Sequence, residues 1–136
     1  MSPTIELLTD FAPDDRATSN LHSRAFGDET SAAVQPWAER LHRHSLTWVG
    51  AFLGDEMLAF VHVGWDGGIH GFLLDTVVHP GHRRTGLGRA VVTAAVESAR
   101  AGGCTSVHVD HEPHLKTFYR DACGFTSTSA ALIYLG

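Results

Sequence analysis

The 136-residue sequence has little of several features that would point to particular protein classes. Its two cysteines, Cys104 and Cys123, are too few for a disulfide framework or a structural zinc site. No apolar run approaches the roughly 20 residues that span a membrane. The first residues, MSPTIELLTD, lack the positive start and the apolar stretch of a secretory signal. We therefore expect a cytoplasmic protein without a membrane partner.

An excess of positive charge is also lacking. Fifteen acidic residues outnumber ten lysines and arginines, which gives a formal net charge of −5. Phosphate-backbone binding needs a basic surface, so we expect no nucleic-acid partner. The apolar fraction of 43% and the charged fraction of 18% are typical of a folded globular protein. Without repeats or linkers, residues 1–136 are expected to form a single domain.

The spacing of apolar residues predicts strands and helices in the order β-α-α-β-β-β-α-β-α-β. Strands are expected at residues 4–8, 46–53, 57–64, 70–78, 105–109 and 130–135, and helices at about 12–25, 31–44, 87–101 and 114–122. In the third helix, small and apolar residues form one stripe, which predicts close packing on a sheet: Leu87, Val91, Ala94 and Ser98.

The most informative segment, residues 74–89, reads LDTVVHPGHRRTGLGR. It joins a predicted strand to a predicted helix through a loop that is rich in arginine and glycine. The first turn of a helix presents unpaired N–H groups and the positive end of the helix dipole. Glycines let an anion approach those groups closely. The segment therefore suits a phosphate or a pyrophosphate, although a glycine-rich turn that only caps a helix stays open.

Two common phosphate motifs do not fit this segment. A nucleotide P-loop has lysine and then serine or threonine after its last glycine, whereas Gly86 is followed by Leu87 and Gly88. A dinucleotide fingerprint would need glycine at position 91, which is Val91, and belongs to the first strand–helix unit of a chain.

The residues RRTGLG at 83–88, directly after a strand and His-Pro, match the pattern Arg/Gln-x-x-Gly-x-Gly/Ala. Here the sequence resembles the GCN5-related N-acetyltransferase (GNAT) superfamily, in which this segment is the acetyl-coenzyme A motif. The resemblance implies that Val77 and Val78 contact the pantetheine arm. It also implies a set of residues that cradle the pyrophosphate: Arg83, Arg84, Thr85, Gly86, Leu87, Gly88 and Arg89.

A second segment, residues 114–125, looks like the family's "FY…GF" stretch. The resemblance implies that Tyr119 protonates the departing thiolate and that Phe118 belongs to the cofactor site. Four residues separate Tyr119 from Gly124 where three are usual, so we expect the helix end to be one residue longer. Glu112 stands where the family often has asparagine. A core tyrosine with a satisfied hydroxyl is the alternative for Tyr119.

The resemblance implies an α/β (α+β) domain with a mixed, mostly antiparallel, twisted sheet of six to seven strands and about four helices. The cofactor would enter a gap between the fourth and fifth strands. The implied activity is direct transfer of an acetyl group from acetyl-CoA to a primary amine of a small molecule or peptide. Small members of the family often dimerise, so a homodimer is compatible with it. A non-catalytic module that binds or senses acyl-CoA is the alternative.

A general base would take a proton from the acceptor amine. Asp75, two residues before Val77, is the preferred candidate, while His70, His111 and Glu112 stay open. Asp75 could instead pair with an arginine or cap a turn. By the resemblance, a backbone N–H at Val77 or Val78 would stabilise the oxyanion.

The remaining histidines and cysteines allow further hypotheses. Residues 108–114, HVDHEPH, resemble a metal cluster, but their spacing matches neither an HExxH helix nor a closed four-ligand set. We therefore expect no metal, with a metal-dependent hydrolase as a distant alternative. Buried structural thiols are preferred over an acyl-carrying cysteine. Four scattered histidines are expected at the surface or in packing: His22, His42, His44 and His62.

Overall fold

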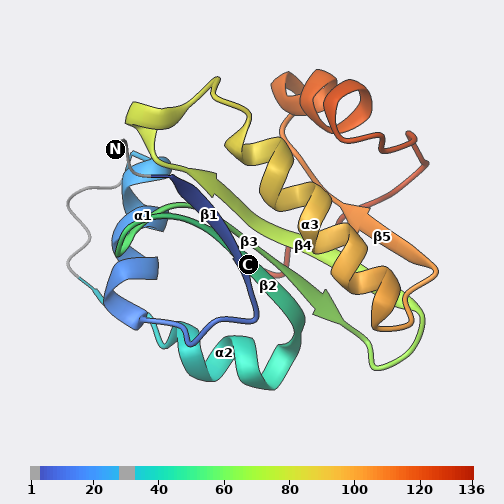
Figure 1. The fold of residues 1–136 in the computed structure, drawn as a ribbon. Helices are drawn as coiled ribbons and strands as arrows, with labels where there is room; N and C mark the ends of the chain where they lie inside the picture. The colour runs from blue at the N-terminus through green and yellow to red at the C-terminus, as the bar shows by residue number, and fades with distance from the viewer. Residues whose placement is uncertain (1–3, 28–32) are drawn as a thin grey trace.

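A five-stranded sheet forms the centre of the computed structural model, which describes residues 4–27 and 33–136 (Figure 1). Its strands lie side by side in chain order: β1 (Ile5–Thr9), β2 (Ser45–Leu53), β3 (Glu56–Trp65), β4 (His70–Val78) and β5 (Ser106–Val109). The pairs β1/β2, β2/β3 and β3/β4 are antiparallel, and β5 is parallel to β4. The prediction of a mixed, mostly antiparallel sheet is confirmed.

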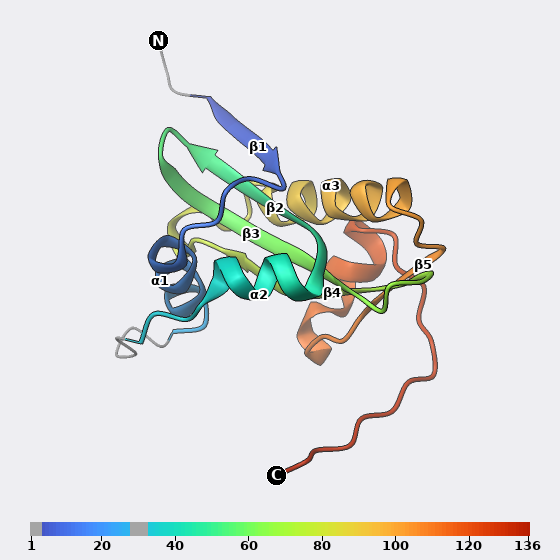
Figure 2. The same ribbon diagram turned by 90° about the horizontal axis from the view of Figure 1, so that it is seen from below.

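Helices cover both faces of this sheet. α1 (Asp15–Ala25) and α2 (Trp37–His44) lie on one face and α3 (Leu87–Ala101) on the other, as the view from below shows (Figure 2). Each face has its own apolar core: the α1/α2 side contains Leu21, Trp37, Leu41, Trp48, Met57, Phe60 and Val77. The α3 side contains chiefly aliphatic residues of β2, β3 and α3. No helix in the described part of the chain is long and apolar enough to cross a bilayer.

Helix α3 packs closely on the sheet, as its small residues predict. Its fully buried positions include Val91, Ala95 and Ala99, whereas Ala94 and Ser98 are only half-buried. The buried face is therefore turned by about one residue from the predicted stripe. Because of this rotation, the Ser98 hydroxyl lies 2.8 Å from the Thr47 hydroxyl and forms a hydrogen bond with it, instead of being buried among apolar side chains.

The second helix is shorter than predicted. α2 begins at Trp37 instead of residue 31, and residues 33–36 are irregular. Pro36 explains the difference, because proline lacks the N–H that a helix interior needs and disfavours the helical conformation of the residue before it. Residues 31 and 32 of the predicted helix lie outside the described residues. The first helix, α1, begins at Asp15 instead of about residue 12, because Asp14 caps it by accepting a hydrogen bond from the Ala17 N–H at 2.8 Å.

The predicted strand at 130–135 is wrong, so the described residues form five strands instead of six to seven. The segment is extended but pairs with no strand, and its side chains are exposed, Ile133 by 81%. In Figure 2 it runs away from the body of the domain. An apolar pattern alone does not make a strand, because a strand also needs a partner for its backbone N–H and C=O groups.

The predicted helix at 114–122 is present, but its hydrogen bonding is irregular. A 3₁₀ turn at Pro113–Leu115 continues through two α-helical residues, 116 and 117, into a π turn at Phe118–Ala122, which the Cys123 N–H closes by donating to the Phe118 carbonyl at 3.0 Å. A π turn contains one residue more than an α turn. It is therefore where the expected extra residue between Tyr119 and Gly124 is accommodated.

Candidate active site

Strands β4 and β5 diverge halfway along their length. Residues 70–73 of β4 pair with residues 106–109 of β5, after which the pairing stops. The rest of β4, Leu74–Val78, has no strand on that side within residues 4–27 and 33–136. Its backbone is therefore available to pair with an extended ligand, at the predicted gap between the fourth and fifth strands. Val77 packs toward α1 and α2, and Val78 packs toward α3.

Helix α3 begins beside this unpaired half of β4. Gly86 is its N-terminal cap, with a φ of +86° that suits glycine. The first helical bond runs from the Ala90 N–H to the Gly86 carbonyl at 3.0 Å, so the three preceding N–H groups have no partner within the helix. Gly88 allows a close approach, because a Cβ there would lie 3.2 Å from Phe118 Cζ. Phe118 thus lies against the start of α3.

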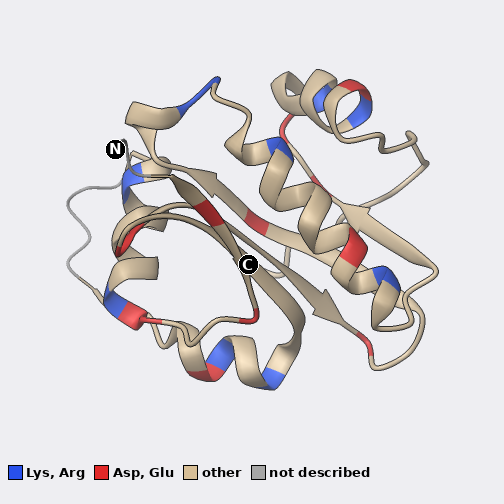
Figure 3. Ribbon diagram, viewed as in Figure 1, with Lys and Arg blue, Asp and Glu red and all other residues tan. Residues whose placement is uncertain are grey.

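The loop before α3 is basic, and Figure 3 shows one blue segment in this loop and another near the start of the helix. Arg84 and Arg89 are exposed, and Arg84 adopts a left-handed backbone with φ of +64°. Arg83 has another role, since its guanidinium donates to the Ala25 carbonyl at 2.8 Å and ties the loop to the end of α1. The Thr85 hydroxyl donates to the His82 carbonyl within the same turn.

These groups fit acetyl-CoA, which carries negative phosphates and an extended arm with two amides. Unpaired N–H groups at a helix start and two exposed guanidiniums suit the phosphates. The unpaired half of β4 suits the amides of the arm. The residues that the sequence implies for the cofactor are therefore close together. The Arg83 guanidinium, however, is already hydrogen-bonded to the Ala25 carbonyl.

Tyr119 lies in a cavity between the two diverging strands, the Tyr119 cavity. The residues lining it come from the end of α1, β4, β5, residues 110–119 and the C-terminal segment: Phe26, Leu73, Asp75, Thr76, Val109, Asp110, His111, Glu112, Leu115, Tyr119, Leu132 and Tyr134. The ring of Tyr119 is buried and stacks on His111 with centroids 5.0 Å apart. Burial raises the pKa of Tyr119, and a hydrogen bond with Thr76 only partly opposes this. The phenol is therefore protonated at neutral pH and can act as an acid.

Asp75 lies at a bulge in β4, where Asp75 and Thr76 both fall opposite Val61. Its φ of +56° is unusual for a residue other than glycine. Its two carboxylate oxygens face two histidines: Oδ1 lies 3.0 Å from His22 Nε2, and Oδ2 lies 2.7 Å from His62 Nε2. Burial alone would raise the pKa of Asp75, but these two hydrogen bonds outweigh it and hold the pKa well below its usual range. Asp75 is thus ionised and shared between two imidazoles.

A second cavity, the α1 cavity of ≈ 360 Å³, adjoins this carboxylate. It lies between α1 and α2 and is lined by Ser19, His22, Ser23, Phe26, Ala33, Gln35, Trp37, Arg40 and Asp75. Phe26 and Asp75 line both this cavity and the Tyr119 cavity. Asp75 therefore stands between the tyrosine on one side and His22 on the other.

Comparisons with known proteins agree with this geometry. A model of the acetyltransferase (GNAT) family matches residues 6–125. The chain belongs to this family. The curated protein GCN5-related N-acetyltransferase 1, chloroplastic, of Arabidopsis thaliana is 31% identical over 86 residues, which are 63% of this chain and 43% of that protein. The chain thus matches less than half the length of this relative.

Solved structures of acetyltransferases share the fold. An acetyltransferase of Trypanosoma brucei superposes with a TM-score of 0.79 at 20% identity, over 96% of this chain and 99% of that one. The aminoglycoside N-acetyltransferase AAC(6')-Iy in complex with CoA superposes with a TM-score of 0.78 at 16% identity, over 100% and 97% of the two chains. At these identities the likeness is one of fold.

The other candidate residues of this family member are spread out. His70 and His108 lie beside Ser106 on the exposed β4–β5 surface, and His114 is exposed. Glu112 and His111 line the Tyr119 cavity. Within the described ranges, no three or more His, Cys, Asp or Glu residues are grouped as metal ligands.

Both cysteine thiols have a raised pKa, for which burial is the main cause. They are protonated at neutral pH and therefore poor nucleophiles. Cys104 is buried in the α3-side core, and Cys123 packs against that core. These positions support structural thiols.

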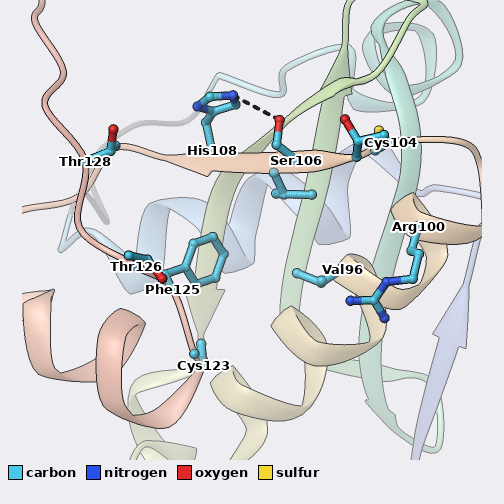
Figure 4. A pocket seen from close by; sticks show the side chains of 12 residues that line it. Val96, Arg100, Cys104, Ser106, His108, Cys123, Phe125, Thr126 and Thr128 are labelled. Atoms are coloured by element: carbon cyan, nitrogen blue, oxygen red, sulfur yellow. Dashed lines mark hydrogen bonds between the residues drawn. The ribbon is translucent and has the colours of Figure 1, made fainter.

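A further cavity lies between α3, β5 and residues 123–128 (Figure 4). Arg100, His108 and Thr128 are among its lining residues. It includes none of the residues that the sequence predicts for the cofactor or for catalysis.

Two residues of the site, His22 and His62, were expected from the sequence only at the surface or in packing. His62 is buried, and its position within the otherwise apolar run MLAFVHV was a signal that it needs a polar partner. His22 lies next to the buried Leu21 of α1, and no sequence pattern links it to Asp75, 53 residues later.

Proposed function

We propose that the protein transfers an acetyl group from acetyl-CoA to a primary amine of a small molecule or peptide. The observation that carries this proposal is the unpaired half of β4, which leads into the basic helix start of α3 and lies beside Tyr119. Direct transfer between two bound substrates needs no acyl-enzyme, and the raised pKa values of both cysteines agree with that.

Acetyl-CoA supplies the reactive thioester. The α3 N–H groups at residues 87–89, with Arg84 and Arg89, would hold its pyrophosphate. The backbone of Val77 and Val78 would pair with its arm, and one of their N–H groups would polarise the acetyl carbonyl. Phe118 closes the site against Gly88.

Tyr119 would protonate the departing thiolate, because its phenol carries a proton at neutral pH. Asp75 belongs to the acceptor side, where an ionised carboxylate favours a cationic amine. Since Asp75 lines both cavities, an amine beside it reaches toward the unpaired half of β4. Holding the two substrates together there would supply much of the acceleration.

The first test is calorimetric titration of the protein with acetyl-CoA. We expect micromolar binding that is lost in Gly86→Val, because Val at this φ distorts the loop and places a side chain at the helix start. Gly103→Val is the matched control: Gly103 also has positive φ and open space, but lies at the other end of α3. Absence of binding to the folded wild-type protein would refute the proposal.

Turnover separates the enzyme from a non-catalytic acyl-CoA sensor. Release of CoA thiol is measured with three primary amines: kanamycin, spermidine and a tetra-alanine peptide with a free N-terminus. Kanamycin is included because a structural neighbour is an aminoglycoside N-acetyltransferase. An enzyme releases CoA with at least one amine, whereas a sensor binds acetyl-CoA and releases none.

A further inference from the structure

The contacts of the two histidines beside Asp75 fix which ring nitrogen carries the proton in the neutral imidazole. An ionised carboxylate can only accept hydrogen bonds, so each imidazole must donate from Nε2. His22 Nε2 lies 3.0 Å from one oxygen and His62 Nε2 lies 2.7 Å from the other. A neutral imidazole with a proton on Nε2 has its basic lone pair on Nδ1. The Nδ1 atoms of the two rings are therefore the only places where either could take another proton.

The two Nδ1 atoms differ in their surroundings. His62 is buried, and its Nδ1 lies 2.8 Å from the Ser45 hydroxyl, which donates to it. Both nitrogens of His62 are thus satisfied, and the ring holds Asp75 in place. For His22 Nδ1, the described residues provide no hydrogen-bond partner.

His22 is also accessible from the acceptor side. Its side chain is 33% exposed and lines the α1 cavity. The ring lies between Phe26 and Trp37, with centroids 4.6 Å and 5.5 Å away. These contacts and the bond to Asp75 fix the orientation of the ring, as a catalytic base requires.

We propose that His22 is the general base that deprotonates the acceptor amine, with Asp75 as its positioning residue; this inference rests on the proposed acetyl transfer. The acceptor ammonium gives one proton to His22 Nδ1, and the freed lone pair forms the C–N bond to the acetyl carbon. The C–S bond breaks, and the thiolate takes a proton from Tyr119. The new amide nitrogen loses its second proton, which restores the tyrosine through solvent, and His22 later releases its own proton to solvent.

Four elements place charged or titratable groups near His22: β4, β3, α2 and α1 itself. Asp75 of β4 stabilises the imidazolium that forms, and His62 of β3 shares that carboxylate. Arg40 of α2 lines the same cavity but lies over the Trp37 ring, 4.8 Å from its centroid. On α1 itself, Arg24 is engaged with His79. A general base at this position predicts that kcat/KM for the amine falls as the pH is lowered.

Nitrogen NMR of the cofactor-free protein tests the predicted protonation without requiring activity. The wild-type spectrum should contain an Nε2–H imidazole with an unprotonated Nδ1 that disappears in His22→Gln. An Nδ1–H form for His22 would overturn the assignment even if acetyl transfer is confirmed.

Kinetics with acetyl-CoA and the best of the three amine probes test the role. Glutamine at position 22 can still donate to Asp75 but cannot take the proton, so we expect kcat/KM to fall about 10²–10⁴-fold at neutral pH. The rate of His22→Gln should keep rising with pH, as the free amine increases, where the wild type levels off. His62→Gln should lose less and keep the wild-type profile shape, and His42→Gln on exposed α2 should be unaffected.

A His22→Gln variant within threefold of the wild type, with the same pH profile, would refute His22 as the base. Equal losses in His22→Gln and His62→Gln with unchanged profiles would also refute it and would indicate a structural role for both. Failure of the proposed function looks different, because the wild type itself would then release no CoA with any probe.

Discussion

The two sides of the candidate site are built in different ways. On the side proposed for the cofactor, β4, the basic loop and the start of α3 follow one another within residues 74–89. On the side proposed for the acceptor, His22, His62 and Asp75 come from α1, β3 and β4 and meet only because the domain folds. A ligand site made from one contiguous segment leaves a sequence motif, whereas a site assembled across the sheet leaves isolated residues. The first kind identifies a family, and the second allows members to differ in acceptor.

The largest loss of activity should come from replacing Tyr119, which lies between the two sides. Tyr119→Phe removes the phenol proton and should lower kcat about 10²–10⁴-fold, the usual contribution of a general acid. The affinity for acetyl-CoA should stay within about twofold, because the ring still fills its buried position. Stopped-flow or steady-state release of CoA, with calorimetry alongside, measures both. A parallel loss of binding and turnover would instead assign Tyr119 to the core.

The affinity for acetyl-CoA should depend on where a positive charge is removed, and not only on the net charge. Arg84→Glu, in the exposed loop before α3, should weaken acetyl-CoA binding about 10–100-fold, because a charged hydrogen bond contributes about 1.5–3 kcal/mol. The loss should shrink as salt is added.

Arg100→Glu is the charge-matched control, since Arg100 lies in the last turn of the same helix, where its partner is Glu97. Its titration with acetyl-CoA should match that of the wild type. Equal weakening in both variants would mean that only net charge matters and that the loop is no specific site.

The sequence predicted those features that depend on interactions between residues close together in the chain. The glycine at 86 and the His-Pro stop act through neighbours in the chain, so their pattern predicted the helix start. Anion binding by the arginines and the helix start stays a prediction. Sequence reasoning failed where partners are distant. The bulge at Asp75 and the bonds to His22 and His62 depend on strand register, which no single segment encodes.

The hydrogen bonds of Asp75 to His22 and His62 should contribute to stability as well as to the reaction rate. The pKa of Asp75 is lowered by folding, so its stabilising effect is complete above its unfolded value of about 3.9 and is lost as the pH falls toward its folded value. Asp75→Asn should lower the free energy of unfolding at pH 7 by about 1–3 kcal/mol, because two bonds to a charged acceptor are weakened.

Urea unfolding at pH 7 and pH 3 measures this effect. The wild type should lose more stability than Asp75→Asn between the two pH values. Asp55→Asn, in the exposed β2–β3 turn, removes the same charge and should stay within about 0.5 kcal/mol of the wild type at pH 7. If Asp75→Asn and the wild type declined equally, the two histidines would not hold the carboxylate in solution.

The smallest effect is expected in residues 130–135, which were predicted as a strand but pair with no other strand. Ile133 is 81% exposed, so Ile133→Ala should change the free energy of unfolding by less than about 0.5 kcal/mol. Leu58→Ala in the fully buried part of β3 is the contrast and should cost about 2–5 kcal/mol. A loss of more than 1 kcal/mol in Ile133→Ala would show that residues 130–135 pack against β5 after all. The apolar pattern would then have been right, and the border of the Tyr119 cavity at Leu132 and Tyr134 would be a fixed wall of the acceptor side.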